Sequence, residues 1–255
     1  AGISRYTFDA WLARRAVEQG ATVLTETRVE DWRTKSEAGR FEADLSSGET
    51  LQAEGILIGT GRVLAAKIKR ERPDLPFVGF KAHFDGVDME ETLEMHLTPG
   101  AYVGLSNIGP NRVNCACIAD AKRVTSMEGL LPKKLAGAEM VFSEWMALRA
   151  PRFSLQDVPD WPDAYFIGDA AGSIFPATGD GLAMGLTSGR MVADYAIKGD
   201  AGGFRAAWKK RYASRIRWGR VLHEILMKPV YARSMMTVCG RWPGIAESLF
   251  RRTRE

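Results

Sequence analysis

The stretch from Ala164 to Ala196 constrains the fold more than any other part of this chain. It opens with an apolar run that predicts a buried strand, and Gly168 and Asp169 follow at the carboxyl end of that strand. A loop rich in Pro and Gly comes next, and a long helix is expected from Gly181 onward. A strand, a glycine turn and a helix in this order indicate an open α/β sheet, which binds ligands outside the carboxyl ends of its strands.

The turn and the helix start carry groups suited to a large, partly anionic cofactor. Asp169 offers a carboxylate to ligand hydroxyl groups, and Gly168 lets the backbone turn close to a ligand. Gly179, Asp180 and Gly181 open the helix, whose free N–H groups and positive dipole end favour negative charge. The alternative is an ordinary strand–turn–helix connection in which Asp180 serves as a helix cap.

The chain before residue 60 alternates helix and strand patterns. Apolar spacing predicts a helix over Thr7–Gln19, with Ser4 or Thr7 as its cap and Gly20 as its stop. Ala21–Trp32 is expected to form a strand, and the segments on either side of Ser46–Glu49 a hairpin. An apolar run ending at Gly59 is typical of a strand buried in a parallel sheet.

The middle of the chain changes character, because short strand patterns separated by turn residues predict an antiparallel sheet. The four expected strands are Val78–Phe84, Leu93–Leu97, Ala101–Leu105 and Arg112–Ile118. A helical pattern is expected over Met127–Arg149, and further helices run to the end with breaks near Pro229 and Pro243.

Together these patterns predict a mixed α/β protein in which a Rossmann-like open sheet is interrupted by an inserted antiparallel sheet and followed by C-terminal helices. The expected cofactor-binding domain comprises residues 1–75 and 150–200. Residues 76–149 would form the substrate domain, and residues 201–255 the C-terminal helical segment.

The three cysteines indicate neither a metal site nor a disulfide framework. Cys115 and Cys117 alternate with Ala116 on one side of an expected strand, which predicts buried structural thiols. No Cys or His spacing typical of a metal site is present, and an odd cysteine count is consistent with a reducing, cytoplasmic compartment.

Basic residues are concentrated at the C-terminal end. Residues 204–255 contain 13 Lys and Arg against 3 Glu. Two interpretations remain open: a solvated helical surface, or docking to an anionic membrane or an acidic partner. No nucleic-acid-binding module accompanies the charge, so we expect no nucleic-acid partner. No apolar run approaches the ~20 residues that span a bilayer.

The pattern GD-AAG-x3-P-x2-GDG, beginning at Gly168 and followed by a helix of small residues, resembles the flavin loop of a large superfamily. These are the FAD-dependent oxidoreductases of geranylgeranyl reductase, aromatic-ring monooxygenase and halogenase type. The opening segment from Ile3 to Ala21 is similar to the helix after the first βαβ unit of that family. The segments Gly79–Phe84, Glu94–His96 and Tyr102–Leu105 are similar to its substrate-domain sheet.

The resemblance implies that the Rossmann-like part is an incomplete FAD/NAD(P)-binding domain and that the inserted antiparallel sheet is a substrate domain. It also implies a flavin site with named residues. Asp169 would contact the ribityl chain of FAD, and Arg5 would reach the cofactor from its helix start; the alternative for Arg5 is a surface role. The residues implied to line the isoalloxazine ring are Pro176, Gly179, Asp180 and Gly181. His83 and His96 are candidate proton donors near flavin N5, with a structural or exposed imidazole as the alternative.

Two departures from the family pattern limit which properties of the family we expect of this chain. No GxGxxG fingerprint is present, since Leu64 and Met184 stand where the last glycine would be. With the missing initiator Met, this predicts an incomplete chain without the N-terminal ADP-binding unit. Thr60 replaces the Asp that the family often carries before Gly61, so the use of NAD(P)H as electron donor stays open.

The resulting hypothesis is an FAD-dependent oxidoreductase, or the larger part of one, that passes a hydride from flavin N5 to an apolar, isoprenoid-like or quinone-like substrate. A flavin-dependent hydroxylase or halogenase is the alternative within the superfamily. A binding protein that has lost FAD is the alternative of another class.

Overall fold

The computed structural model describes residues 2–35, 40–61, 76–90, 92–127, 129–141, 145–150 and 153–254. The chain divides into two compact units. The antiparallel unit comprises Ala1–Leu24, Pro73–Arg152 and Glu224–Gly240. The parallel unit comprises Thr25–Arg72, Phe153–His223 and Arg241–Glu255. Leu64, where the fingerprint fails, lies outside the described residues.

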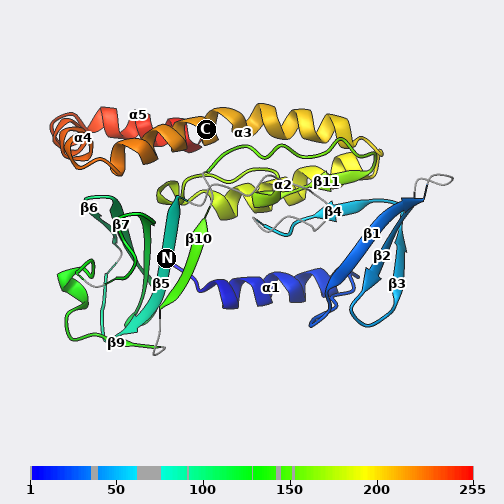
Figure 1. The fold of residues 1–255 in the computed structure, drawn as a ribbon, viewed down its shortest axis with the longest axis horizontal. Coiled ribbons are helices and arrows are strands. Elements are labelled where there is room, and N and C mark those ends of the chain that lie inside the picture. The colour runs from blue at the N-terminus through cyan, green and yellow to red at the C-terminus, as the bar shows by residue number, and fades with distance from the viewer. Residues whose placement is uncertain are drawn as a thin grey trace. The chain divides into compact units, whose positions relative to one another are not determined.

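A six-stranded antiparallel sheet forms the body of the antiparallel unit (Figure 1). Its strands run in the order β10-β5-β8-β7-β6, and β9 pairs with β5. Left-handed backbone at Gly100 and Asn111 closes the two hairpins β6–β7 and β7–β8. The four predicted strands are confirmed, and the bounds are β5 Phe77–Asp85, β6 Leu93–Thr98, β7 Ala101–Gly109, β8 Arg112–Asp120, β9 Glu139–Met140 and β10 Met146–Ala150.

One face of this sheet carries a core to which both strand cysteines belong. Cys115 and Cys117 are buried beside Leu105 and Val113. Burial raises the pKa of each thiol to about 12, so both stay protonated at neutral pH. The prediction of buried, free thiols on one strand face is confirmed.

Glycine and proline mark the ends of two helices of this unit. Helix α1, Arg5–Glu18, begins two residues before the expected Thr7. Ser4 occupies the N-cap position, but its side chain makes no capping bond among the described residues. The helix stops before Gly20, as predicted, and Gly20 has a φ of 93°. Helix α4, Pro229–Arg241, starts at a proline, whose missing N–H costs nothing in the first turn.

The prediction of a helix over Met127–Arg149 is wrong for the described part of that segment. The chain instead forms a short 3-10 turn at Lys133–Leu135 and then adds β9 and β10 to β5. Gly129 and Gly137 adopt positive φ and Pro132 lies between them, so no helix can run through. The free edge of β5 then determines the conformation of Met146–Ala150 by pairing with it.

The parallel unit contains two small sheets and three helices in its described residues (Figure 1). The bounds are β1 Val29–Lys35, β2 Arg40–Leu45, β3 Thr50–Ala53, β4 Ile56–Ile58, β11 Ala164–Phe166, α2 Gly181–Ala196, α3 Ala201–Leu226 and α5 Pro243–Arg254. The predicted hairpin is confirmed as β2–β3. The strand expected over Ala21–Trp32 begins only at Val29, because Glu26 adopts a φ of 55° within a turn.

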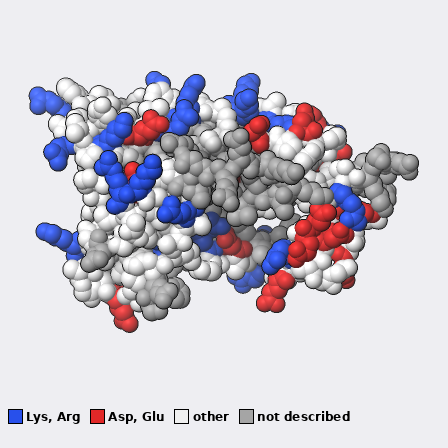
Figure 2. Space-filling view, viewed as in Figure 1, with Lys and Arg blue, Asp and Glu red and all other residues white. Residues whose placement is uncertain are grey.

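Charged side chains of both signs alternate on the three-stranded sheet β1-β2-β3 (Figure 2). Arg33 on β1 bridges the carboxylates of Glu42 and Asp44 on β2. The opposite face of β1 carries Trp32, which is buried edge-on against Trp161 at 5.0 Å between ring centroids. This sheet therefore has one solvated and one packed face, as antiparallel sheets commonly do.

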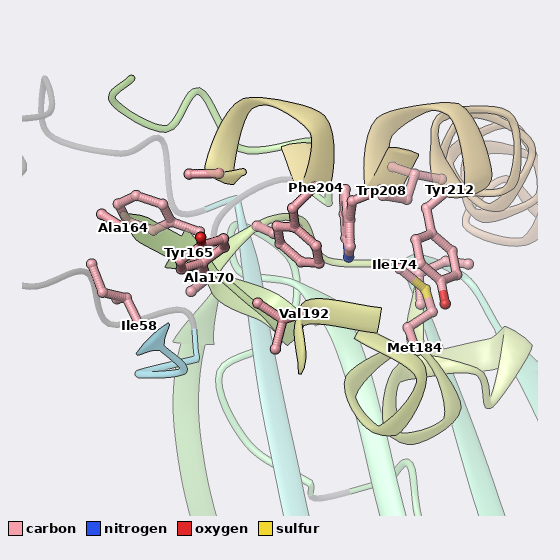
Figure 3. Packing of buried hydrophobic residues seen from close by; sticks show 14 of the residues in the cluster. Ile58, Ala164, Tyr165, Ala170, Ile174, Met184, Val192, Phe204, Trp208 and Tyr212 are labelled. Atoms are coloured by element: carbon pink, nitrogen blue, oxygen red, sulfur yellow. The ribbon is translucent and has the colours of Figure 1, made fainter. Parts of the chain in front are cut away.

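The core of the parallel unit lies between the strand pair and helices α2 and α3 (Figure 3). Phe204, Trp208 and Tyr212 extend from α3 at a spacing of four residues and are almost fully buried. They pack with Tyr165 of β11 and Val192 of α2. A break that the sequence analysis did not foresee separates α2 from α3 at Gly199, where φ is 65°.

Candidate functional site

The candidate site starts at the carboxyl ends of two parallel strands. β4 and β11 pair in parallel with Ile56 opposite Ala164, and Ile167 N–H extends the ladder by donating to the Ile58 carbonyl at 3.0 Å. After β4 the chain turns at Gly61, which has a φ of 68°, and after β11 it turns at Gly168. Both glycine turns therefore lie at the same edge of the sheet, where α/β proteins bind ligands.

Gly168 sets the course of the loop after β11. Its φ of 56° lies in the left-handed region that favours glycine. Its carbonyl accepts bonds from the N–H groups of Ala171 at 3.0 Å and Gly172 at 3.2 Å, which winds Gly168–Ala170 into a 3-10 turn. Asp169 is half-buried in this turn, so part of the residue remains accessible to solvent.

The loop is fastened to the helix behind it by a buried hydroxyl. The Gly168 N–H donates to Ser188 Oγ at 3.0 Å, and Ser188 Oγ donates to the Gly185 carbonyl at 2.8 Å. Ser188 is completely buried. The sequence analysis missed this residue, although a serine between Met184 and Val192 on a buried helix face is a signal that a polar partner lies opposite.

A second turn leads into helix α2. Pro176–Thr178 form a 3-10 turn in which the Thr178 hydroxyl donates to the Phe175 carbonyl at 2.9 Å. Gly179 follows with a φ of 72°, and Asp180 stands at the N-cap of α2. Asp180 is buried, but its side chain makes no capping bond to the helix among the residues that the structure describes. The structure therefore does not support the alternative in which the Asp180 side chain caps the helix.

The start of α2 is open along the face that carries its glycines. Gly181 is exposed at the N-terminal end, where backbone N–H groups lack intrahelical acceptors. A Cβ added at Gly181, Gly185 or Gly189 would meet no neighbouring atom within 4 Å among the described residues, apart from the helix's own backbone. These three glycines therefore leave open space along one face of the helix.

The structure brings together all but one of the predicted cofactor-binding residues. Gly168, Asp169, Pro176, Gly179, Asp180 and Gly181 all belong to the loop and helix start of the parallel unit. Arg5 lies in the antiparallel unit, where its guanidinium pairs with Asp9 through bonds of 2.9 to 3.1 Å. Its role toward a cofactor stays a prediction.

The two candidate histidines also lie in the antiparallel unit, and they are not neighbours. His83 is on β5 and His96 on β6, with β8 and β7 between them, which separates the strands by about 14 Å. His83 is buried, and its pKa is lowered by burial and then by the charges of Lys81 and Arg112. His96 is 43% exposed and lies 2.9 Å from Glu94.

The described residues place no three metal-ligating side chains of His, Cys, Asp or Glu together. None of the described helices combines the length and apolarity that crossing a bilayer requires.

Comparisons with known proteins were made by sequence and by structure. No protein-family model matches the chain. A menaquinone reductase of Mycolicibacterium smegmatis is 26% identical, with the match covering 89% of this chain and 62% of that protein. A digeranylgeranylglycerophospholipid reductase of Methanopyrus kandleri is 28% identical, covering 84% of this chain and 62% of that protein. The chain thus spans about three fifths of the length of these relatives.

Solved structures share the fold at lower sequence identity. The flavin-dependent brominase Bmp2 matches with a TM-score of 0.79 over 98% of this chain and 70% of its own, at 15% identity. A geranylgeranyl bacteriochlorophyll reductase-like protein of Thermoplasma acidophilum matches with a TM-score of 0.71 over 88% of this chain and 63% of its own, at 17% identity. The predicted mixed α/β fold is therefore confirmed as that of Rossmann-type flavoproteins. The chain is related in sequence to these reductases and has the fold of the FAD-dependent reductases, monooxygenases and halogenases, which confirms the resemblance seen in its Gly-Asp loop.

Proposed function

We propose that this chain supplies the isoalloxazine and ribityl part of the FAD site of an oxidoreductase. The observation that carries the proposal is the Gly168–Asp169 turn at the end of a parallel strand pair, fastened to a helix whose N-terminal end is open. Bound FAD would supply the redox chemistry, with hydride transfer to a substrate as the favoured reaction.

Each residue of the loop would have a distinct task. The Asp169 carboxylate would accept hydrogen bonds from ribityl hydroxyl groups, and the N-terminal end of α2 would stabilise negative charge on the ring. Pro176 and Gly179 would shape the turn that the ring rests against. The open face of α2 at Gly181 and Gly185 would let the ring approach the helix backbone.

The favoured substrate is apolar, of isoprenoid or quinone type. The relatives in sequence are reductases named for menaquinone and for a digeranylgeranyl lipid, which supports the reductase class over the monooxygenase and halogenase alternatives. The non-catalytic alternative predicts a protein that binds no FAD.

The deciding experiment measures FAD binding by the purified, full-length protein through its visible absorption and flavin fluorescence. We expect Asp169→Asn to weaken FAD binding at least about tenfold, because a charged hydrogen-bond acceptor is lost. Asp194→Asn, on the exposed side of α2, is the matched control and should bind FAD normally. A wild-type protein without affinity for FAD would establish the non-catalytic alternative, and unchanged affinity in Asp169→Asn would remove Asp169 from the site.

We also propose that the C-terminal helices contact an anionic membrane surface. Helix α4 exposes Val230, Tyr231 and Met236, each at least 55% exposed, beside the basic Arg233. Amphipathic faces with aromatic and basic residues are typical of helices that lie in a membrane interface. Co-sedimentation with vesicles of neutral lipid alone and with added anionic lipid tests this, and equal binding to both would refute it.

A further inference from the structure

A cavity of about 330 Å³ lies in the parallel unit between α3, the strand β11 and the segment Leu155–Val158. It is separate from the open glycine face of α2. Phe166 of β11 and Ala171 of the loop contribute to one wall, and Phe204 and Trp208 of α3 contribute to another. Figure 3 shows Phe204 and Trp208 side by side, pointing from α3 toward the strand and loop.

Most of the cavity wall is apolar, and its charged groups come from the helix and the facing segment. Arg205 and Lys209 follow Phe204 and Trp208 by one position each, so both cations lie along the same side of α3. Arg205 is held in place, since its guanidinium donates to the Pro159 carbonyl at 3.1 Å and pairs with Asp160.

Lys209 is the cation that remains available at this cavity. It is exposed and forms no ion pair within the part of the chain that the structure describes. Asp157 also lines the cavity, but that residue is engaged in an interaction of its own. The charged residues that line the cavity are Arg205 and Lys209 against Asp157, so cations outnumber carboxylates in its wall. Helix α3 as a whole is also basic, with seven Lys and Arg against Glu224.

We propose that this cavity binds a small amphiphilic monoanion, with its apolar part between Phe166, Phe204 and Trp208 and its anionic group at Lys209. A volume of about 330 Å³ lies at the lower end of the range of small-molecule pockets, which selects a short chain or a single ring over a long lipid tail. The mostly apolar wall accounts for affinity, and the single lysine accounts for the preference for a carboxylate or a similar anion.

An occupant would touch the loop that carries Asp169. Ala171 lines the cavity and donates its N–H to the Gly168 carbonyl, while its own carbonyl accepts the Gln156 N–H at 3.0 Å. The residues that line the cavity do not include Asp169 or the start of α2, so an occupant would contact this loop without occupying the candidate cofactor site.

Octanoate, titrated into the protein by isothermal calorimetry, tests the proposal, with 1-octanol as the uncharged comparison. We expect octanoate to bind at one site and octanol to bind about threefold to fivefold more weakly. Lys209→Gln should reduce octanoate affinity by the same factor and leave octanol unaffected. Lys210→Gln is the matched control, because Lys210 is exposed on the same helix turn but does not line the cavity.

Val158→Trp, which fills the cavity from the facing segment, should abolish binding of both ligands while circular dichroism confirms that it folds. Lys209→Gln lies on the surface and remains informative even if Val158→Trp does not fold. Absence of octanoate binding by the wild-type protein, equal affinity for octanoate and octanol, or equal effects of the two lysine substitutions would each overturn the proposal.

Discussion

The backbone N–H of Gly168 donates a 3.0 Å hydrogen bond to Oγ of Ser188, twenty residues further along the chain. The same hydroxyl donates to the Gly185 carbonyl at 2.8 Å. Ser188 thereby joins the glycine turn after β11 to helix α2, and its complete burial keeps water from replacing either bond. This side chain thus helps to hold the turn that carries Asp169 against the helix.

Ser188→Ala is expected to destabilise the protein by about 1–3 kcal/mol, because it leaves the buried Gly168 N–H without an acceptor. Chemical denaturation monitored by circular dichroism measures this, with Thr187→Ala on the same helix as the control. A loss no larger than that of Thr187→Ala would show that the bond contributes nothing.

Gly168→Ala is expected to cost about 1–2 kcal/mol through backbone strain alone, since an L-residue at a φ of 56° is disfavoured. The added Cβ would lie 3.8 Å from Gly185 Cα, an ordinary contact, so no steric clash adds to the strain. Gly168→Asn should cost less than Gly168→Ala, because Asn tolerates this region better. The reverse order in denaturation midpoints would contradict the strain account.

Gly172→Ala is expected to destabilise by a different cause, namely overpacking. A Cβ at Gly172 would lie 2.7 Å from Cη2 of Trp208, an atom that Trp208→Phe removes. The single substitution should cost about 1–3 kcal/mol. In a double-mutant cycle, the variant with both Gly172→Ala and Trp208→Phe should lose less unfolding free energy than the two single variants together. Strict additivity would show that the Trp208 ring does not cause the overpacking.

His83 makes stability dependent on pH. Its pKa is lowered in the folded protein by burial, then by Lys81 and Arg112, with Asp85 opposing them. The unfolded state therefore binds this proton more readily than the folded state does. The contribution of neutral His83 to the free energy of unfolding is complete above its ordinary pKa of 6.5, and it decreases as the pH falls through and below that value. Asp85 is held ionised by Arg112, which keeps the pKa of Asp85 below its ordinary 3.8 and outside this window.

His83→Gln should flatten the dependence of the unfolding free energy on pH between about pH 7 and about pH 5. Urea denaturation at several pH values measures the slope for both proteins. Equal slopes would show that another group is responsible.

Local signals in the sequence were sufficient to predict most of the individual helices, strands and turns. Glycine at positive φ stopped α1 at Gly20, and Pro229 and Pro243 started α4 and α5, because these residues restrict the backbone wherever they occur. The loop from Gly168 to Gly181 was also predictable, since its glycines, proline and acidic residues lie in one continuous stretch. The assignment of residues 1–75 and 150–200 to a cofactor domain stays a prediction.

Contacts between distant segments were not predictable in this way. Met146–Ala150 has a helical pattern, yet it forms β10 because the edge of β5 offers it hydrogen-bond partners. The tie from Gly168 to Ser188 and the cavity bordered by Phe166 and Trp208 likewise join residues from separate elements. The sequence by itself determined where the chain turns and which loop carries the candidate cofactor chemistry, since turn formation is local. Only the tertiary structure decided how that loop is held and what lies behind it, since hydrogen bonding and burial depend on which segments meet in space.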